Sequence, residues 1–230
     1  MLINPYIFSS EPSPPPDPVF WVSADYGITK DVADVVSAWE NQGTDTANLG
    51  GKINSPTWRD AIIGGEPVVT FTSDSLAVNL DTTYDSQVST LFIVCKINTS
   101  YANDFGGRLL DWGAASQATL WEYCQENIQL LFVNQTDLLY TPRPVPDTAL
   151  FVVLLNGDDS TYRRNGAKIE DGTVSGTYTD LNYLRVGGQA SGTQWALDTD
   201  VAEIRIFDAA LTIDQIQTIE SELMDKYGLS

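Results

Sequence analysis

The sequence contains no histidine, and this absence excludes much of the common chemistry of enzymes. Without an imidazole there is no Ser-His-Asp or Cys-His nucleophile and no imidazole-based metal site. Carboxylates could still catalyse, but retaining glycosidases need two of them about 5 Å apart. The nearest acidic pairs, Glu122 with Glu126 and Glu203 with Asp208, do not alternate along one strand, and we interpret them as solvated surface residues. We therefore expect that the chain is not an enzyme.

Basic residues are also scarce. Lysine and arginine number 12 against 31 aspartate and glutamate residues, which gives a formal net charge of -19. The basic residues are scattered, apart from the adjacent pair Arg163 and Arg164. Because binding to phosphates needs clustered positive charge, we exclude nucleic acid and anionic membrane surfaces as partners.

Long hydrophobic runs are missing. The longest, residues 149–155, is far shorter than the roughly 18 residues that suggest a membrane span, and we interpret it as a buried strand. No basic residue precedes Lys30, and Asn4 and Pro5 interrupt the apolar start that a signal peptide would need. We therefore expect synthesis in a cytoplasm without general secretory export.

Only two cysteines occur, Cys95 and Cys124, and their spacing fits no zinc or redox motif. Both lie in apolar, strand-like segments. Buried thiols are the favoured interpretation, because the expected compartment is not oxidising, and a disulfide is the alternative.

What the sequence does contain is a series of short strand patterns separated by turn residues, within 230 residues that are 43% hydrophobic. The turns are marked by pairs such as Asn165-Gly166 and Asp171-Gly172. This pattern predicts a single domain with two stacked antiparallel sheets. The expected strands cover residues 88–97, 107–112, 118–124, 127–133, 150–155, 161–163, 183–186 and 201–207.

The last thirty residues predict a strand followed by a helix. Residues 202–207 alternate apolar and charged side chains, which is typical of a strand with one buried face. Thr212 and Gln215 have the spacing of a capping box, and Lys226 and Gly228 suit the end of a helix. The apolar stripe of the helix is Ile216, Ile219, Leu223 and Tyr227.

These segments, in this order, resemble laminin-G-like, concanavalin-A-like jelly-roll domains. At the end of the chain the likeness rests on AEIRIFD at 202–208 and ESELMDKYGL at 220–229. Near the start it rests on FWVSAD at 20–25, VVSAWENQG at 35–43, SPTW at 55–58 and GEPVVTF at 65–71. The resemblance covers roughly residues 18–229 and departs from the family at residues 195–200, where a compact glycine is often found. It implies an all-β fold, an antiparallel β-sandwich of jelly-roll type with a C-terminal α-helix, over residues 18–230.

Residues 1–17 differ in kind from the rest. An apolar tip at residues 1–8 precedes a proline-rich stretch, residues 9–18, which favours a stiff, extended spacer. We interpret the segment as a docking arm, and it resembles the short N-terminal stub of tailed-phage particle proteins. A disordered terminus or an added strand of the domain's own sheet are the alternatives. The expected docking residues are Leu2, Ile3, Pro5, Tyr6, Ile7 and Phe8.

Carbohydrate recognition is an activity that the family resemblance implies. It would need exposed aromatic faces beside acids and amides, and the candidates are Tyr101, Asp104, Trp112 and Trp195. We expect no cofactor and assign no metal site. Calcium is kept as an alternative, because Asp104, Asp158, Asp159, Asp198 and Asp200 occur in loop-like segments.

Two functions remain. The first is a non-enzymatic structural or decoration protein of a phage particle, located in the virion after synthesis in the host cytoplasm. Its partners would be a capsid or tail protein, bound by the arm, and further copies of itself, with a trimer favoured. The alternative is a carbohydrate-binding adhesin or receptor-recognition module whose partner is a cell-surface glycan. The two functions do not exclude each other.

Overall fold

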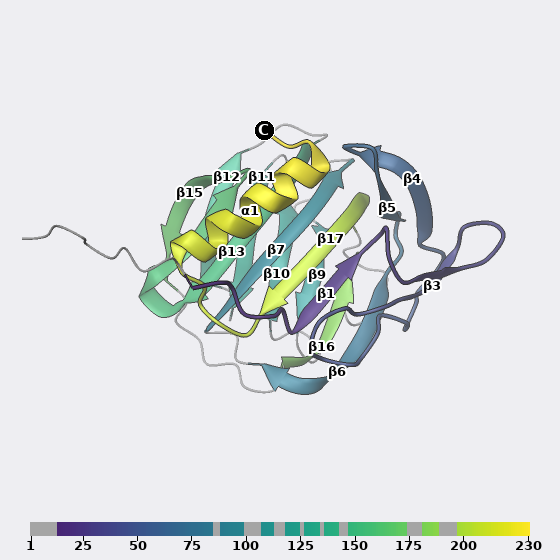
Figure 1. Ribbon diagram of the computed structural model, residues 1–230, viewed down its shortest axis with the longest axis horizontal. Coiled ribbons are helices and arrows are strands. Elements are labelled where there is room, and N and C mark those ends of the chain that lie inside the picture. The colour runs from purple at the N-terminus through teal and green to yellow at the C-terminus, as the bar shows by residue number, and fades with distance from the viewer. Residues whose placement is uncertain are drawn as a thin grey trace, which may run out of the picture.

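A computed structural model describes residues 13–84, 88–98, 107–112, 118–124, 127–133, 136–142, 147–173, 181–188 and 197–230. Two antiparallel sheets stack on each other, and one helix covers the outer face of the first sheet (Figure 1). This is the predicted all-β sandwich with a C-terminal helix. The predicted docking residues Leu2, Ile3, Pro5, Tyr6, Ile7 and Phe8 lie outside the described residues.

The first sheet has eight strands among the described residues. Its central strand β17 (Thr199–Phe207) pairs with β7 along one edge and with both β5 and β1 along the other. In spatial order the sheet runs β15 (Ala167–Gly172), β14 (Ser160–Arg164), β13 (Asp147–Asn156), β7 (Val88–Ile97), β17, β5 (Glu66–Phe71) and β4 (Thr57–Ile63), with β1 (Phe20–Ser23) beside β17.

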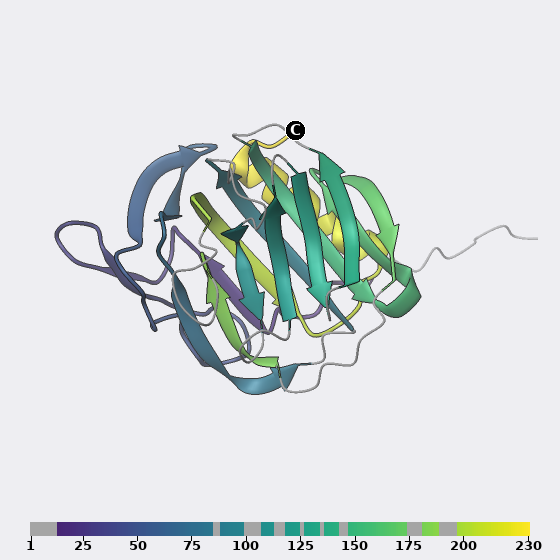
Figure 2. The same ribbon diagram turned by 180° about the vertical axis from the view of Figure 1, so that it is seen from behind.

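The second sheet has seven strands in the described part of the chain (Figure 2). Its order is β12 (Thr136–Pro142), β11 (Asn127–Val133), β10 (Ala118–Cys124), β9 (Leu110–Trp112), β16 (Leu181–Val186) and β6 (Leu76–Tyr84), and β8 (Gly107–Arg108) also pairs with β10. A separate hairpin joins β2 (Ile28–Lys30) to β3 (Val36–Trp39), and a short 3-10 turn covers Gly157–Asp159.

The main core lies between the sheets, because alternate side chains of each strand point toward the facing sheet. Phe20, Trp39, Phe71, Leu91 and Ile204 are completely buried there. A second apolar cluster lies outside the first sheet, where Ile216, Ile219 and Leu223 of the helix pack on the sheet with Phe92, Val94, Leu150, Val152 and Ala202. The molecule therefore has three layers, which are a helix and two sheets.

Helix α1 (Ile213–Tyr227) begins and ends as predicted. The Thr212 hydroxyl accepts a hydrogen bond from the backbone N–H of Gln215 at 3.3 Å, and the Gln215 side chain accepts one from the backbone N–H of Thr212 at 3.0 Å. Gly228 ends the helix with a positive φ of 60°, where a side chain would be strained. Both ends are fixed by local chemistry, which explains why they could be predicted.

Strand β17 differs from its prediction. The alternation of charge predicted one exposed face, but all nine residues of the strand are buried. A register shift between Val201 and Glu203 places Glu203 and Arg205 on the outer face, where helix α1 and the Trp21 side chain of the neighbouring strand β1 contact them. The prediction that Glu203 is a solvated surface acid is therefore wrong, since 1% of its surface is exposed.

The described part of the proline-rich spacer lies against the start of α1 (Figure 1). The side-chain amide of Gln215 donates to the carbonyl oxygens of Ser13, at 3.3 Å, and Pro14, at 3.1 Å. The chain then enters β1. The spacer thus lies on the helix-covered face of the sandwich.

Two further findings concern membrane spans and the cysteines. No helix among the described residues is long and apolar enough to span a membrane. Cys95 is buried in β7 of the first sheet. Cys124 belongs to β10 of the second sheet, but its side chain is outside the described residues, so the pairing of the two thiols stays a prediction.

Candidate functional site

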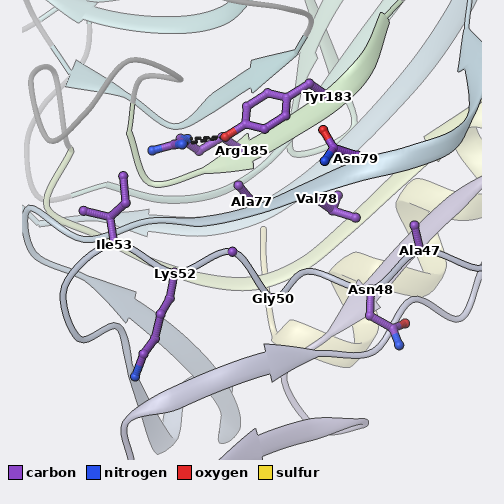
Figure 3. A pocket seen from close by; sticks show the side chains of 11 residues that line it. Ala47, Asn48, Gly50, Lys52, Ile53, Ala77, Val78, Asn79, Tyr183 and Arg185 are labelled. Carbon is purple, nitrogen blue, oxygen red and sulfur yellow. Dashed lines mark hydrogen bonds between the residues drawn. The ribbon is translucent and has the colours of Figure 1, made fainter.

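A pocket of about 560 Å³ lies at the edge of the second sheet, where residues 47–53 run beside strand β6 (Figure 3). The backbone N–H groups of Gly50 and Gly51 donate to the carbonyl oxygen of Ala77 at 3.0 and 2.9 Å. Ile53 and Ser75 exchange backbone hydrogen bonds at 2.9 and 3.1 Å. A β-carbon at Gly51 would lie 3.3 Å from the Ala77 carbonyl oxygen, so glycine suits this close approach. We call this feature the sheet-edge pocket.

Side chains alternate between the two faces of a strand, and this alternation places polar side chains in the sheet-edge pocket. On β6, Leu76, Val78 and Leu80 pack into the core, so the intervening Ala77 and Asn79 face outward. On β16, Leu184 and Val186 are buried in the core, which leaves Tyr183 and Arg185 on the outer face. The register pairs Asn79 with Tyr183 and Ala77 with Arg185, so these four residues form one patch.

Arg185 is the most unusual member of this patch, because only 7% of its surface is exposed. Its Nε donates to the Tyr183 hydroxyl at 2.9 Å, and its Nη2 donates to the same oxygen (Figure 3). Its Nη1 donates to Ser75 Oγ at 3.2 Å. No carboxylate in the described part of the chain forms an ion pair with it. The positive charge is therefore held by two neutral hydroxyl groups.

The lining of the sheet-edge pocket is rich in hydrogen-bond donors and contains no acid among the described residues. Asn79 lies next to Tyr183, whereas the Lys52 side chain points away from Arg185 (Figure 3). The remaining lining residues are Ala47, Asn48, Gly50, Gly51, Ile53, Ala77 and Val78. Such a concave site, with a few converging polar groups, has the general form of a small-ligand site.

A second polar cluster surrounds Glu203 beneath the helix, and we call it the Glu203 network. One carboxylate oxygen accepts from Trp21 Nε1 at 2.9 Å and Arg205 Nε at 2.6 Å. The other accepts from Tyr227 Oη at 2.7 Å, Lys226 Nζ at 2.9 Å and Ser23 Oγ at 3.2 Å. The network therefore connects β1, β17 and the end of α1.

Electrostatics keep this network charged. Burial by itself would raise the pKa of Glu203, but Arg205 and Lys226 attract the carboxylate and lower its pKa below the ordinary value. Burial and the neighbouring Glu203 raise the pKa of the Tyr227 hydroxyl, so this group remains a donor. With all of these donors satisfied and the carboxylate buried, the Glu203 network holds the helix on the sheet and offers no open position to a ligand.

Where the structure describes them, the acids considered for calcium come together at most as a pair. Asp200 accepts from Thr70 Oγ1 at 2.5 Å and from Asn98 Nδ2 at 3.1 Å, and Asp198 accepts from the same Asn98 nitrogen at 3.3 Å. Asp158 and Asp159 are exposed in the 3-10 turn. In the described ranges no three acidic or cysteine side chains are grouped to hold a metal ion. Calcium binding and the expected lack of a cofactor stay predictions.

Of the four predicted carbohydrate-binding residues, only the backbone of Trp112 lies within the described part of the chain. Tyr101, Asp104 and Trp195 lie outside the described residues. Trp112 pairs through its backbone with Leu184 of β16, in the same sheet as the sheet-edge pocket, but its side chain is outside the description. Sequence reasoning missed Tyr183 and Arg185. The signal was available in residues 183–186, where polar side chains (Tyr183, Arg185) alternate with apolar ones (Leu184, Val186) and so share one face of a strand.

Comparison with known proteins yields structural likeness alone. No family model matches the sequence, and no curated protein matches it. Trypanosoma rangeli sialidase is similar in structure with a TM-score of 0.58 and 17% identity, over 97% of this chain and 37% of that chain. The receptor-binding domain of botulinum neurotoxin mosaic serotype C/D has a TM-score of 0.63 and 12% identity, over 90% of this chain and 51% of that chain. This chain thus spans about a third to a half of those structures.

The comparison corrects one expectation. The prediction that the chain is not an enzyme is contradicted, because a sialidase shares its fold over nearly the whole chain. The prediction rested on the missing histidine and on the lack of closely spaced carboxylates along one strand, and neither absence excludes tyrosine chemistry or carboxylates brought together by the fold. At these identities the likeness shows the fold and assigns no activity. By sequence pattern, sheet topology and structural likeness together, the chain is a β-sandwich of jelly-roll type.

Proposed function

We propose that the chain is a recognition module that binds a carbohydrate in the sheet-edge pocket. The observation that carries this proposal is the convergence of a guanidinium, a phenol and an amide, from Arg185, Tyr183 and Asn79, in one concave site. Sugars present many hydroxyl groups that need such directional partners. A volume of about 560 Å³ also falls within the range usual for small-molecule sites.

Two structural neighbours support a role in recognition, and one of them is bound to a sugar. One of them is a Trypanosoma rangeli sialidase in complex with sialic acid, with a TM-score of 0.57 and 15% identity over 89% of this chain and 33% of that chain. The botulinum neurotoxin neighbour is a receptor-binding domain. Fold alone does not specify function, so the proposal depends on the side chains in the pocket.

A glycan array tests this proposal. Wild-type protein should bind a defined subset of glycans. Asn79→Ala should weaken that binding, because Asn79 is exposed, lines the pocket and forms no side-chain hydrogen bond with the described residues. Lys168→Ala is the matched control, since Lys168 is exposed on β15 of the other sheet. Silence of the wild-type protein across the array would overturn the proposal.

A second proposal concerns where the module works. We propose that it belongs to a phage particle, attached through residues 1–17 to a capsid or tail protein. The supporting observation is the position of the spacer, which Gln215 holds on the helix-covered face, whereas the sheet-edge pocket lies on the other sheet (Figures 1 and 2). Attachment through the helix side would leave the pocket sheet facing outward.

Deletion of residues 1–17 tests the second proposal. The truncated protein should fold, because the described spacer contributes hydrogen bonds to Gln215 and no strand to either sheet. It should fail to enter purified particles while the full chain enters them. Normal incorporation of the truncated protein would show that the arm does not dock. Light scattering coupled to size exclusion would test self-association, for which a trimer is expected.

A further inference from the structure

We propose that the ligand in the sheet-edge pocket carries a carboxylate, as an acidic saccharide does, and that Arg185 binds this group. The inference rests on the proposed function and adds the chemical class of the ligand. It depends on the charge of Arg185 and on its hydrogen bonds to Tyr183, which also lines the pocket, and to Ser75 beside it.

Arg185 is a buried positive charge that has no ion-pair partner among the residues that the structure describes. Arg185 is 7% exposed, and a buried cation is costly unless an anion compensates it. The partners that the structure gives Arg185 are the neutral hydroxyls of Tyr183 and Ser75. An anionic ligand would supply the missing charge.

Tyr183 and Arg185 also have more hydrogen-bond donors than the described residues have acceptors for them. Because the Tyr183 oxygen accepts hydrogen bonds from two nitrogens of Arg185, the phenol proton is directed elsewhere. No described residue accepts it. The three hydrogen bonds of Arg185 also leave part of its guanidinium edge without an acceptor in the described residues. A ligand group with acceptors alone, which a carboxylate is, satisfies both.

The nearby acids among the described residues already bind other side chains. Asp111 lies opposite Arg185 in the register of β9 and β16, but it is 1% exposed and forms an ion pair with Arg108 at 3.4 Å. Asp81, further along β6, accepts a hydrogen bond from Thr46. Neither of these two described acids forms an ion pair with Arg185, so they leave its charge for a ligand to neutralise.

Arginine also has the right shape for this role. Its planar guanidinium matches the two oxygens of a carboxylate and can bind them as a pair, which a lysine ammonium cannot do. Strand β16 fixes the backbone of Arg185 between β6 and β9, and the hydrogen bonds to Tyr183 and Ser75 fix its side chain. The site is therefore organised before a ligand arrives.

The decisive experiment compares sugars that differ in one group. Isothermal titration calorimetry or ligand-observed NMR is run on full-length protein with galactose, galacturonic acid and galacturonic acid methyl ester. The same experiment is run with glucose, glucuronic acid and glucuronic acid methyl ester. We expect the acid to bind at least about tenfold more tightly than the neutral sugar or the ester, because the ester keeps the shape and removes the charge.

Variants then assign the preference to Arg185. Arg185→Gln should abolish the preference for the acid, and Arg185→Lys should reduce it, because the charge stays and the paired geometry is lost. Lys168→Gln removes an equal charge from the other sheet and should leave the preference intact. Tyr183→Phe, which removes the phenol donor and retains the charge, should weaken binding of the acid several-fold and serves if the arginine variants do not fold.

The outcomes separate the two proposals. Equal binding of acid, ester and neutral sugar would overturn the carboxylate inference and leave carbohydrate recognition intact. Loss of the preference in Lys168→Gln would overturn the role of Arg185, because a general charge effect would then explain the result. No binding of any sugar, together with a silent glycan array, would overturn both.

Discussion

Replacement of Glu203 by glutamine tests how strongly the Glu203 network stabilises the folded protein. The substitution preserves the size of the side chain and removes its charge. In the folded protein the Glu203 carboxylate accepts five hydrogen bonds, among them those from Arg205 at 2.6 Å and Lys226 at 2.9 Å. A glutamine amide would turn an NH₂ group toward donors, so the Glu203 network would lose both an acceptor and its negative charge.

The expected loss of unfolding free energy is about 3 kcal/mol. Breaking one side of a buried ion pair typically costs about 3–5 kcal/mol. We expect the low end, because Arg205 keeps a hydrogen bond to Glu222 at 2.7 Å and Lys226 keeps an ion pair with Asp25 at 3.1 Å. A loss of this size is a large fraction of the roughly 5–15 kcal/mol that stabilises a typical domain.

Urea unfolding followed by tryptophan fluorescence would measure the change, since Trp21 donates to the same carboxylate. Glu222→Gln is the matched control. It makes the same chemical change beside the same Arg205, but the Glu222 side chain is 58% exposed, so its loss should cost less than about 1 kcal/mol. If the two variants lost the same free energy of unfolding within about 0.5 kcal/mol, the burial of Glu203 would not determine how much this residue stabilises the fold.

The pH dependence of stability gives an independent check. Because the pKa of Glu203 is lowered on folding, its contribution is present above the unfolded value near 4.5 and is lost as the pH falls through the folded pKa. The stability difference between wild type and Glu203→Gln should therefore be full at pH 7 and shrink as the pH falls below about 4.5. A difference that stayed constant down to pH 3 would refute this assignment.

Two further predictions concern other contacts of the helix. Glu220→Gln should cost about 3 kcal/mol or more in urea unfolding, because Glu220 binds Arg163 through both oxygens, at 2.8 and 2.7 Å, and both side chains are buried; a loss below about 1 kcal/mol would contradict it. Gly64→Ala should lower the melting temperature far more than Gly65→Ala, since both glycines have positive φ but only a β-carbon at Gly64 would meet the Tyr227 carbonyl oxygen, at 2.3 Å. Equal melting temperatures for these two variants would show that the close approach is not limiting.

The parts of the fold that local chemistry determines could be predicted from the sequence. Strands β7, β10 and β11 have the predicted bounds, because each is an apolar or alternating run between turn residues. The helix follows from its capping box and its terminal glycine. Strands β4 and β6 were missed, because β4 carries Arg59 and Asp60 beside a bulge and β6 carries outward polar residues at a sheet edge.

The candidate site was harder to predict, because it depends on pairings between distant segments. The sheet-edge pocket joins residues 47–53, β6 and β16, and nothing local to Arg185 indicates that a glycine pair more than a hundred residues earlier forms the facing wall. The burial of Glu203 is likewise nonlocal. An alternating strand looks the same in sequence whether its polar face meets water or a helix with matching charges.

The position of β17 has a consequence for the order in which the chain can fold. This strand is made after β5 and β7, yet it fills the space between them and bonds to both. A nascent chain that has reached β16 has two unsatisfied strand edges at the middle of its larger sheet, and such edges invite pairing with other chains. Completion of the sheet must therefore wait until β17 has left the ribosome, which makes the growing polypeptide vulnerable to aggregation or dependent on chaperones during that interval.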